Sequence, residues 1–198
     1  MAIAINGSSN TITGLAVGGL PDGVVDTDML AANAVTAAKA TGSAKGITEL
    51  DQWYLTANQT SDGDITSVAR ASFTNSASPL GTGMSQSSGV FTFPSTGKYL
   101  VILTASLSIT GSDNIYMSTQ VSTDGGSNFS IRNYAQDGTS SGSGTISGGS
   151  TSFTFLDVTS TSDIKVKFNA TSITSGSAIV GDSTIIRTGF TFIRIGDT

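Results

Sequence analysis

The sequence has no cysteine and no histidine. Without cysteine the chain forms no disulfide, a bond that small secreted animal domains often carry, and this disfavours an extracellular eukaryotic origin. Without histidine it holds no Ser–His–Asp or Cys–His catalytic arrangement, and zinc lacks both of its favoured ligand types. The side-chain groups that remain for catalysis or ligand binding are carboxylates, hydroxyls, amides and a few basic groups.

Charged residues are also scarce, at 12% of the chain, and the formal net charge is -5 with a pI of about 4.4. Nucleic-acid binding requires a basic face. The nine lysines and arginines are spread from Lys39 to Arg194, and we interpret the one close pair, Lys165 and Lys167, as a solvated strand face. The composition therefore predicts no nucleic-acid partner.

Long apolar runs are absent too. No stretch of about 18 apolar residues occurs, and no basic N-terminal region precedes a continuous apolar one, so the sequence predicts neither membrane insertion nor a signal peptide. We expect the protein to stay in the cytosol or to leave by another route, such as inside a phage particle. The low charge does not indicate disorder, which requires high net charge with low hydrophobicity, because 37% of this chain is hydrophobic.

Catalytic motifs are missing as well: the sequence contains no G-x-S-x-G, H-E-x-x-H or Walker loop. Paired carboxylates serve glycosidases, but Asp26 with Asp28 and Asp62 with Asp64 lie in turn or cap settings that favour aspartate for backbone reasons. Asp62–Asp64 and Asp124–Gly126 offer oxygen ligands for calcium, yet neither matches an EF-hand loop, and we interpret both as turns. We expect no enzymatic activity, no metal and no cofactor.

The most informative stretch that is present is Gly89–Ser108. Gly89–Phe93 alternates apolar and polar residues and ends at Pro94, which cannot donate to a strand ladder. Tyr99–Ile109 then reads as one long strand with an apolar residue at every second position. Leu100 and Ile102 make the other face apolar in its first half. The pattern predicts a strand in the middle of a packed sheet.

Strand signals recur regularly after Gly46, which predicts an all-β sandwich. One clear half-buried strand places Ile164, Val166 and Phe168 inward. The predicted strands are Trp53–Asn58, Ile65–Thr74, Gly89–Phe93, Tyr99–Ile109, Asn114–Ser122, Phe129–Tyr134, Thr151–Val158, Ile164–Asn169, Ser177–Val180 and Thr184–Ile195.

The last strand is apolar on both faces. Phe190 and Phe192 lie on one face, whereas Ile193 and Ile195 lie on the other, with Ile185 in phase. A strand of this kind requires cover on both sides. Two interpretations stay open: a central strand in a two-layer domain, or a strand with one face in a subunit contact.

Two of these segments carry a resemblance to a known family. The run Phe91-x-Phe93-Pro94-x-x-Gly97-x-Tyr99, followed by a long apolar strand, resembles the central hairpin of C1q/TNF-like heads. Thr188–Ile193 resembles the closing strand of the same family. The resemblance covers roughly residues 50–198 and implies a ten-stranded jelly roll that assembles as a homotrimer. The candidate trimer or core contacts are Phe91, Tyr99, Phe190, Phe192 and Ile193.

Residues 1–46 have a different character from the rest. Ala2–Ile5 and Thr11–Val17 are short alternating runs, and Thr27–Lys39 permits a helix that Asp26 would cap. The apolar content is too thin for an independent core. We therefore predict an extended, partly helical attachment segment over 1–46 and a jelly-roll head over 47–198.

A second resemblance concerns this segment. NAVTAAK after GLPDGVVDTDMLA is similar to linker modules of bacteriophage tail fibres, and the opening MAIAING resembles the start of phage fibre proteins. The resemblance implies a virion protein whose N-terminal segment binds another virion protein. The candidate anchoring residues are its larger apolar ones: Ile3, Ile5, Ile12, Leu15, Val25, Met29, Leu30 and Val35.

These observations lead to a non-enzymatic virion protein, a trimeric short tail fibre or spike whose head meets a host glycan or protein. The candidate surface-binding residues in the loops are Asp124, Ser127, Asn128 and Asp137. An alternative is a trimeric capsid decoration protein with an N-terminal arm that binds the major capsid protein, and the sequence does not separate the two. A third hypothesis, a secreted carbohydrate-binding module, is disfavoured because no signal peptide is predicted.

Overall fold

A computed structural model describes residues 4–6, 8, 11–13, 46–72, 79–140, 144–174 and 176–198. The chain divides into two compact units, Met1–Thr41 and Gly42–Thr198. The roles predicted for residues 1–46 and 47–198, attachment and head, remain predictions.

The first unit contains a two-stranded antiparallel ladder of β1 (Ala4–Asn6) and β2 (Thr11–Thr13). Ile5 lies opposite Ile12 in this ladder, so two of the candidate anchoring residues are paired. The ladder occupies parts of the two predicted alternating runs. The permitted helix over 27–39 and the remaining candidate anchoring residues lie outside the described residues: Ile3, Leu15, Val25, Met29, Leu30 and Val35.

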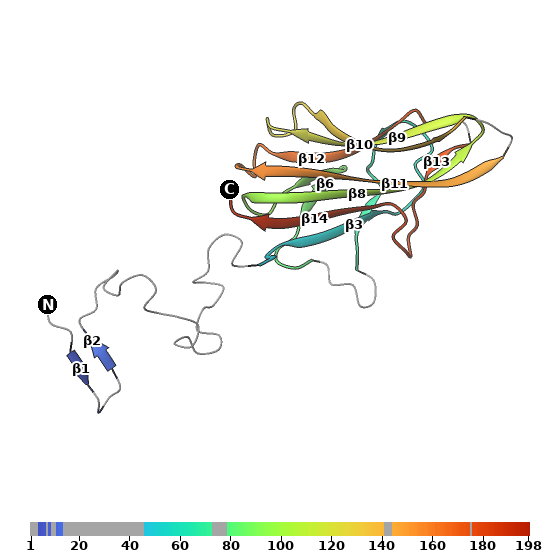
Figure 1. The fold of residues 1–198 in the computed structure, drawn as a ribbon. Helices are drawn as coiled ribbons and strands as arrows, with labels where there is room; N and C mark the ends of the chain where they lie inside the picture. Colours follow the sequence, from blue (N-terminus) through green and yellow to red (C-terminus); the bar gives the residue numbers. More distant parts are fainter. Residues whose placement is uncertain are drawn as a thin grey trace. The chain divides into compact units, whose positions relative to one another are not determined.

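The second unit is a sandwich of two antiparallel sheets, with no helix among its described residues (Figure 1). The first, called the β8 sheet, has the order β11-β8-β14-β3-β5, and β13 also pairs with β8. The second, the β9 sheet, has the order β10-β9-β12-β7-β6, and β4 also pairs with β12. The all-β expectation is confirmed. The strands are β3 (Leu50–Leu55), β4 (Gly63–Asp64), β5 (Val68–Arg70), β6 (Ser85–Ser87), β7 (Val90–Thr92), β8 (Gly97–Thr110), β9 (Asp113–Ser122), β10 (Ser130–Thr139), β11 (Thr145–Val158), β12 (Lys165–Thr171), β13 (Ala178–Ile179) and β14 (Gly189–Gly196).

The predicted central strand is confirmed as β8. It lies between β11 and β14, with Leu100 opposite both Phe155 and Ile193. Its odd-numbered residues from Tyr99 to Ile109 are all buried between the two sheets. The strand is central because its alternating apolar residues fill the core while its backbone pairs on both edges.

Four phenylalanines join the two sheets at the centre of the core. Phe168 of β12 stacks on Phe190 of β14 with ring centroids 4.2 Å apart, and Phe91 of β7 lies 5.1 Å from Phe192 of β14. Aromatic pairs in such offset geometries stabilise a core beyond the area that they bury. The inward orientation predicted for Phe168 is confirmed.

The structure corrects one predicted strand. The sequence predicts a single strand over Ile65–Thr74, but the structure splits its described part, 65–72, between the two sheets, and Phe73 and Thr74 lie outside the described residues. The Ile65 backbone N–H donates to the Phe168 carbonyl of the β9 sheet at 2.9 Å, whereas Val68 pairs with Leu55 of the β8 sheet. The chain crosses from one sheet to the other here because buried Ile65 fills the core between them.

Other boundaries shift for a shared reason. Strand β10 extends beyond the predicted Phe129–Tyr134 into a mostly polar segment, and β11 starts before the predicted Thr151–Val158, in a segment rich in serine and glycine. Strand β6 is polar and was not predicted, and Ile185 precedes β14 rather than belonging to it. In each extension the backbone pairing with β9, β8 or β7 replaces the missing apolar pattern.

The sandwich has two distinct ends. One end holds the first residues of β3 and β8 and the last residues of β14. Pairing shows this, because Leu50 lies opposite Ile193 and Lys98 lies opposite Gly196. We call this the entry end, since the chain enters the sandwich there. At the opposite, far end, β8 finishes at Thr110 and β9 begins at Asp113.

Candidate functional site

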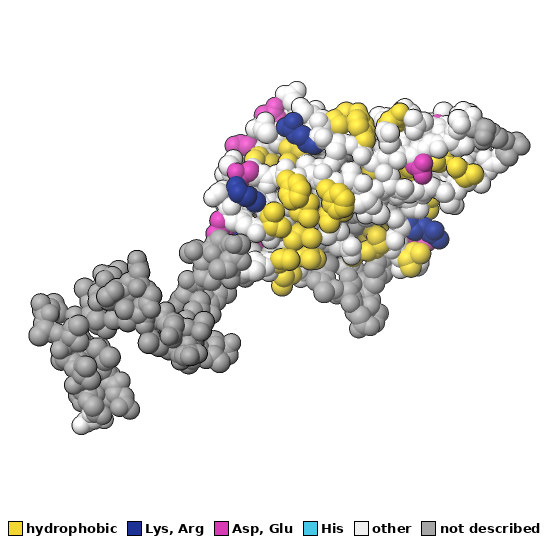
Figure 2. Space-filling view, in the orientation of Figure 1, with side chains coloured by type: hydrophobic (Ala, Val, Ile, Leu, Met, Phe, Trp, Pro, Cys, Tyr) yellow, Lys and Arg dark blue, Asp and Glu magenta, His cyan; other side chains and the backbone are white. Residues whose placement is uncertain are grey.

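A contiguous apolar surface covers part of the outer face of the β8 sheet (Figure 2). Register places Phe155, Leu100 and Ile193 in one row across β11, β8 and β14, and places Phe153 beside Ile102 in the next such row. Phe155 is 70% exposed, Phe153 58% and Ile195 41%. We call these six residues the apolar face: Leu100, Ile102, Phe153, Phe155, Ile193 and Ile195.

The apolar face has the composition of a contact surface. Beyond Thr104 the same face of β8 becomes small and polar, so the apolar residues are confined to the half near the entry end. Lys98 and Asp157 form an exposed ion pair of 3.2 Å at its border. An apolar centre with a polar rim is typical of protein–protein interfaces.

The predicted trimer or core residues separate into two groups. Phe91, Tyr99, Phe190 and Phe192 all lie in the core between the sheets, whereas Ile193 lies on the apolar face. Of this set, only Ile193 is placed where it could contact another chain.

The two most exposed members of the apolar face were not singled out from the sequence. Phe153 and Phe155 point outward, while Ser152 and Thr154 between and beside them are buried. Their hydrophobicity alone would favour the core. Pairing of Phe153 with Ile102 is what puts both rings on the outer face.

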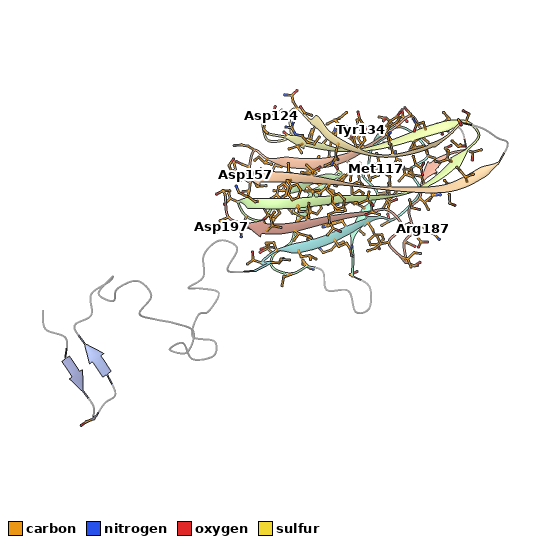
Figure 3. All side chains as sticks on the ribbon, viewed as in Figure 1. Met117, Asp124, Tyr134, Asp157, Arg187 and Asp197 are labelled. Carbon is orange, nitrogen blue, oxygen red and sulfur yellow. The ribbon has the colours of Figure 1, made fainter. Side chains whose placement is uncertain are left out.

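The candidate loop residues Asp124, Ser127 and Asn128 lie in the turn between β9 and β10, at the entry end, as the labels of Asp124, Asp157 and Asp197 show (Figure 3). Asp124 accepts hydrogen bonds from the Ser122 hydroxyl at 2.7 Å and the Asn128 backbone N–H at 2.9 Å. Hydrogen bonds from Ser122 and Asn128 lower the pKa of Asp124 to about 2. This aspartate organises its own turn.

The fourth candidate, Asp137, lies on β10 and supports the neighbouring strand. Its carboxylate accepts hydrogen bonds from the backbone N–H groups of Gly138 at 2.8 Å and Gly149 at 3.2 Å. A Cβ atom at Gly148 would lie 2.4 Å from the same carboxylate, so glycine gives β11 the room to approach. Because β10 runs from the turn at Asp124 toward the far end, Asp137 lies away from that turn.

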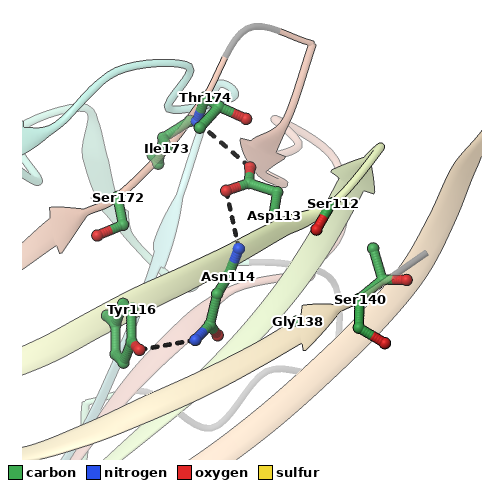
Figure 4. Close-up of a pocket in the computed structure, with 10 residues that line it drawn as sticks. Ser112, Asp113, Asn114, Tyr116, Gly138, Ser140, Ser172, Ile173 and Thr174 are labelled. Carbon is green, nitrogen blue, oxygen red and sulfur yellow. Dashed lines mark hydrogen bonds between the residues drawn. The ribbon is translucent and has the colours of Figure 1, made fainter. Parts of the chain in front are cut away.

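A second surface feature is a polar groove at the far end (Figure 4). The buried carboxylate of Asp113 accepts hydrogen bonds from the backbone N–H groups of Asn114 at 2.8 Å and Thr174 at 3.3 Å. Burial raises the pKa of Asp113, but hydrogen bonds from Ser177, Thr174 and Asn114 outweigh it and leave the pKa below its usual value. The groove residues are Ser112, Asp113, Asn114, Tyr116, Gly138, Thr139, Ser140, Ser172, Ile173 and Thr174.

The other acidic turn, considered above for calcium, is engaged with protein donors. Asp62 accepts a hydrogen bond from the Ile173 backbone N–H at 2.8 Å, and Asp64 accepts from Lys167 and Asn169, each at 2.8 Å. The described residues contain no cluster of three or more metal-binding side chains. They also contain no helix that is long and apolar enough to cross a membrane.

Comparison with solved structures identifies the fold of the sandwich. No protein-family model and no curated protein sequence matches the chain. Among solved structures, the chain is similar to Eiger TNF from S. frugiperda, with 13% identity over 75% of this chain and 93% of that one, and a TM-score of 0.57. It is similar to murine APRIL with 11% identity over 74% and 98%, and a TM-score of 0.53. The sandwich therefore has a TNF-like jelly-roll fold.

Proposed function

We propose that this protein is a non-enzymatic structural component of a bacteriophage virion, a trimeric short tail fibre or spike whose head meets the host surface. The observation that carries the proposal is the apolar face, which in the described part of one chain is left open to solvent. The resemblance of the N-terminal segment to phage fibre linkers supplies the virion context.

The trimer follows from what the apolar face requires. A large exposed apolar surface is a liability unless another chain covers it. In a threefold assembly the contact is heterologous, so this face must meet a different surface of the next chain. The β10 edge offers one, because Ile131 and Tyr134 are about half exposed there. The C1q/TNF-like heads that the sequence resembles also assemble as trimers.

The attachment role rests on the N-terminal unit, whose described strands β1 and β2 form a sheet of their own. Among the described residues the ladder of β1 and β2 has two strands, and an isolated two-stranded ladder is marginally stable in water. It is therefore expected to need a partner.

A capsid decoration protein is the alternative. The observation that favours it is the same ladder, because in the described part of the chain each of its strands is an edge that can add to a strand of a capsid subunit. In that arrangement the N-terminal arm would bind the major capsid protein and the head would project from the capsid.

Quantitative mass spectrometry of purified particles tests the proposal and separates the two roles. A fibre should be present in a few to tens of copies and a decoration protein in hundreds, while a protein absent from particles would refute both. The double variant Leu30→Asp, Val35→Asp should leave the head folded and trimeric but prevent incorporation. Normal incorporation of that variant would remove the anchoring role.

A further inference from the structure

The polar groove has the size and position of a ligand site. Its volume is about 800 Å³, and small-molecule sites typically measure about 300–1,000 Å³. Three separate segments build it: the start of β9, the end of β10 and the residues that follow β12 (Figure 4). It lies at the far end, away from the point where the chain enters the sandwich.

The charge of the groove favours a neutral ligand. Asp113 is the one charged residue among those that line it, and neither lysine nor arginine contributes. This residue is only 7% exposed, and its carboxylate already accepts hydrogen bonds from the backbone N–H groups of Asn114 and Thr174. A phosphate or carboxylate ligand would meet this negative charge with no cation to offset it.

An aromatic ring forms one side of the groove. The Asn114 side-chain amide donates a hydrogen bond to the Tyr116 hydroxyl at 2.6 Å, and Tyr116 packs edge-to-face with Tyr134 at a centroid distance of 5.6 Å. These two contacts hold the Tyr116 ring in place. A fixed tyrosine presents an apolar ring beside a polar hydroxyl, which matches the C–H faces and hydroxyl groups of a sugar.

Three serines also line the groove. Figure 4 marks no hydrogen bond from Ser112, Ser140 or Ser172 to another of the groove residues drawn. Ser172 has a φ of 64°, a left-handed conformation that costs energy for any residue except glycine and that recurs at functional sites. A Cβ atom at position 138 would lie 2.7 Å from the Asn114 side-chain oxygen, so the glycine at this position makes room for the Asn114 amide.

We propose that this groove binds a neutral sugar unit of a polysaccharide. The sugar ring packs on Tyr116, and its hydroxyls exchange hydrogen bonds with Asn114 and Ser172. As the ligand of a virion protein the polysaccharide would belong to the host surface, and in this respect the inference rests on the proposed function. The binding chemistry itself depends only on the groove.

Saturation-transfer NMR on the purified full-length protein tests the inference. The probes are methyl glycosides of glucose, galactose, mannose and N-acetylglucosamine, with sialyllactose and glucose 6-phosphate as charged counterparts. At least one neutral probe should bind, and Asn114→Ala or Ser172→Gly should weaken it at least tenfold. Ser172→Gly removes the hydroxymethyl side chain and relieves the strain of the positive φ, so its thermal unfolding should be unchanged or shifted upward. The matched control is Ser130→Ala, at an exposed serine that begins β10 at the entry end.

Three outcomes would overturn the inference: binding of no neutral probe, binding of charged probes alone, or equal binding by the wild type and both groove variants. The result is separable from the proposed function. A protein found on particles that binds no sugar keeps its virion role and loses this site. A protein that binds sugar through the groove but is absent from particles keeps the site and loses the virion role.

Discussion

Replacing Phe155 with serine removes the most exposed ring of the apolar face. The ring is 70% exposed in one chain, so nearly all of its burial would come from association. Burying a phenylalanine side chain contributes about 2 kcal/mol. Three copies contribute about 6 kcal/mol per trimer, which corresponds to about four orders of magnitude in the association constant. The fold of the single chain should change little, because surface substitutions usually alter stability by less than about 0.5 kcal/mol.

Light scattering and sedimentation velocity over a range of concentrations measure this effect. The wild type should have three times the chain mass of 20.0 kDa, and Phe155→Ser should dissociate at concentrations where the wild type does not. Ile185→Ser is the control, since Ile185 is 50% exposed but lies outside the strands of the apolar face. A wild-type monomer, or a Phe155→Ser trimer with unchanged dissociation, would refute the reasoning.

Three further predictions concern stability. Thr119→Val should raise the free energy of unfolding by about 1 kcal/mol, because the buried Thr119 hydroxyl has no partner within the described residues; a lower thermal midpoint would contradict this. Asp51→Asn should lower the free energy of unfolding measured in urea by about 2–3 kcal/mol, and an unchanged value would contradict this. Buried Asp51 accepts hydrogen bonds from Trp53 at 2.8 Å and from Arg70 at 3.1 Å. The arginine is 34% exposed, so solvent screens part of its interaction with Asp51. The folded-state pKa of Asp124 is lowered from 3.8 to about 2, so the stability that this carboxylate contributes is present above pH 3.8 and is lost as the pH falls toward 2. In Asp124→Asn the thermal midpoint should depend less on pH across that window. A parallel decline in both proteins would exclude the effect.

The sequence by itself determined the fold class and the core of this protein. The alternation from Tyr99 to Ile109 and the stop at Pro94 predicted a central strand, and the alternation from Ile164 to Asn169 predicted a half-buried one. These predictions hold because a strand places alternate residues on opposite faces, so the period of the pattern carries the geometry. The absence of histidine and cysteine directly excluded disulfides and the Ser–His–Asp and Cys–His catalytic arrangements.

Only the tertiary structure decided which apolar residues stay outside and which polar segments meet. Phe153 and Phe155 face outward because of their register with β8, and a one-residue shift would have turned them inward. The groove joins Asn114, Gly138 and Ser172, which lie far apart in the sequence. Their proximity comes from the pairing of β9 with both β10 and β12. Such long-range pairing depends on the whole sheet, and the order of residues along the chain does not encode it locally.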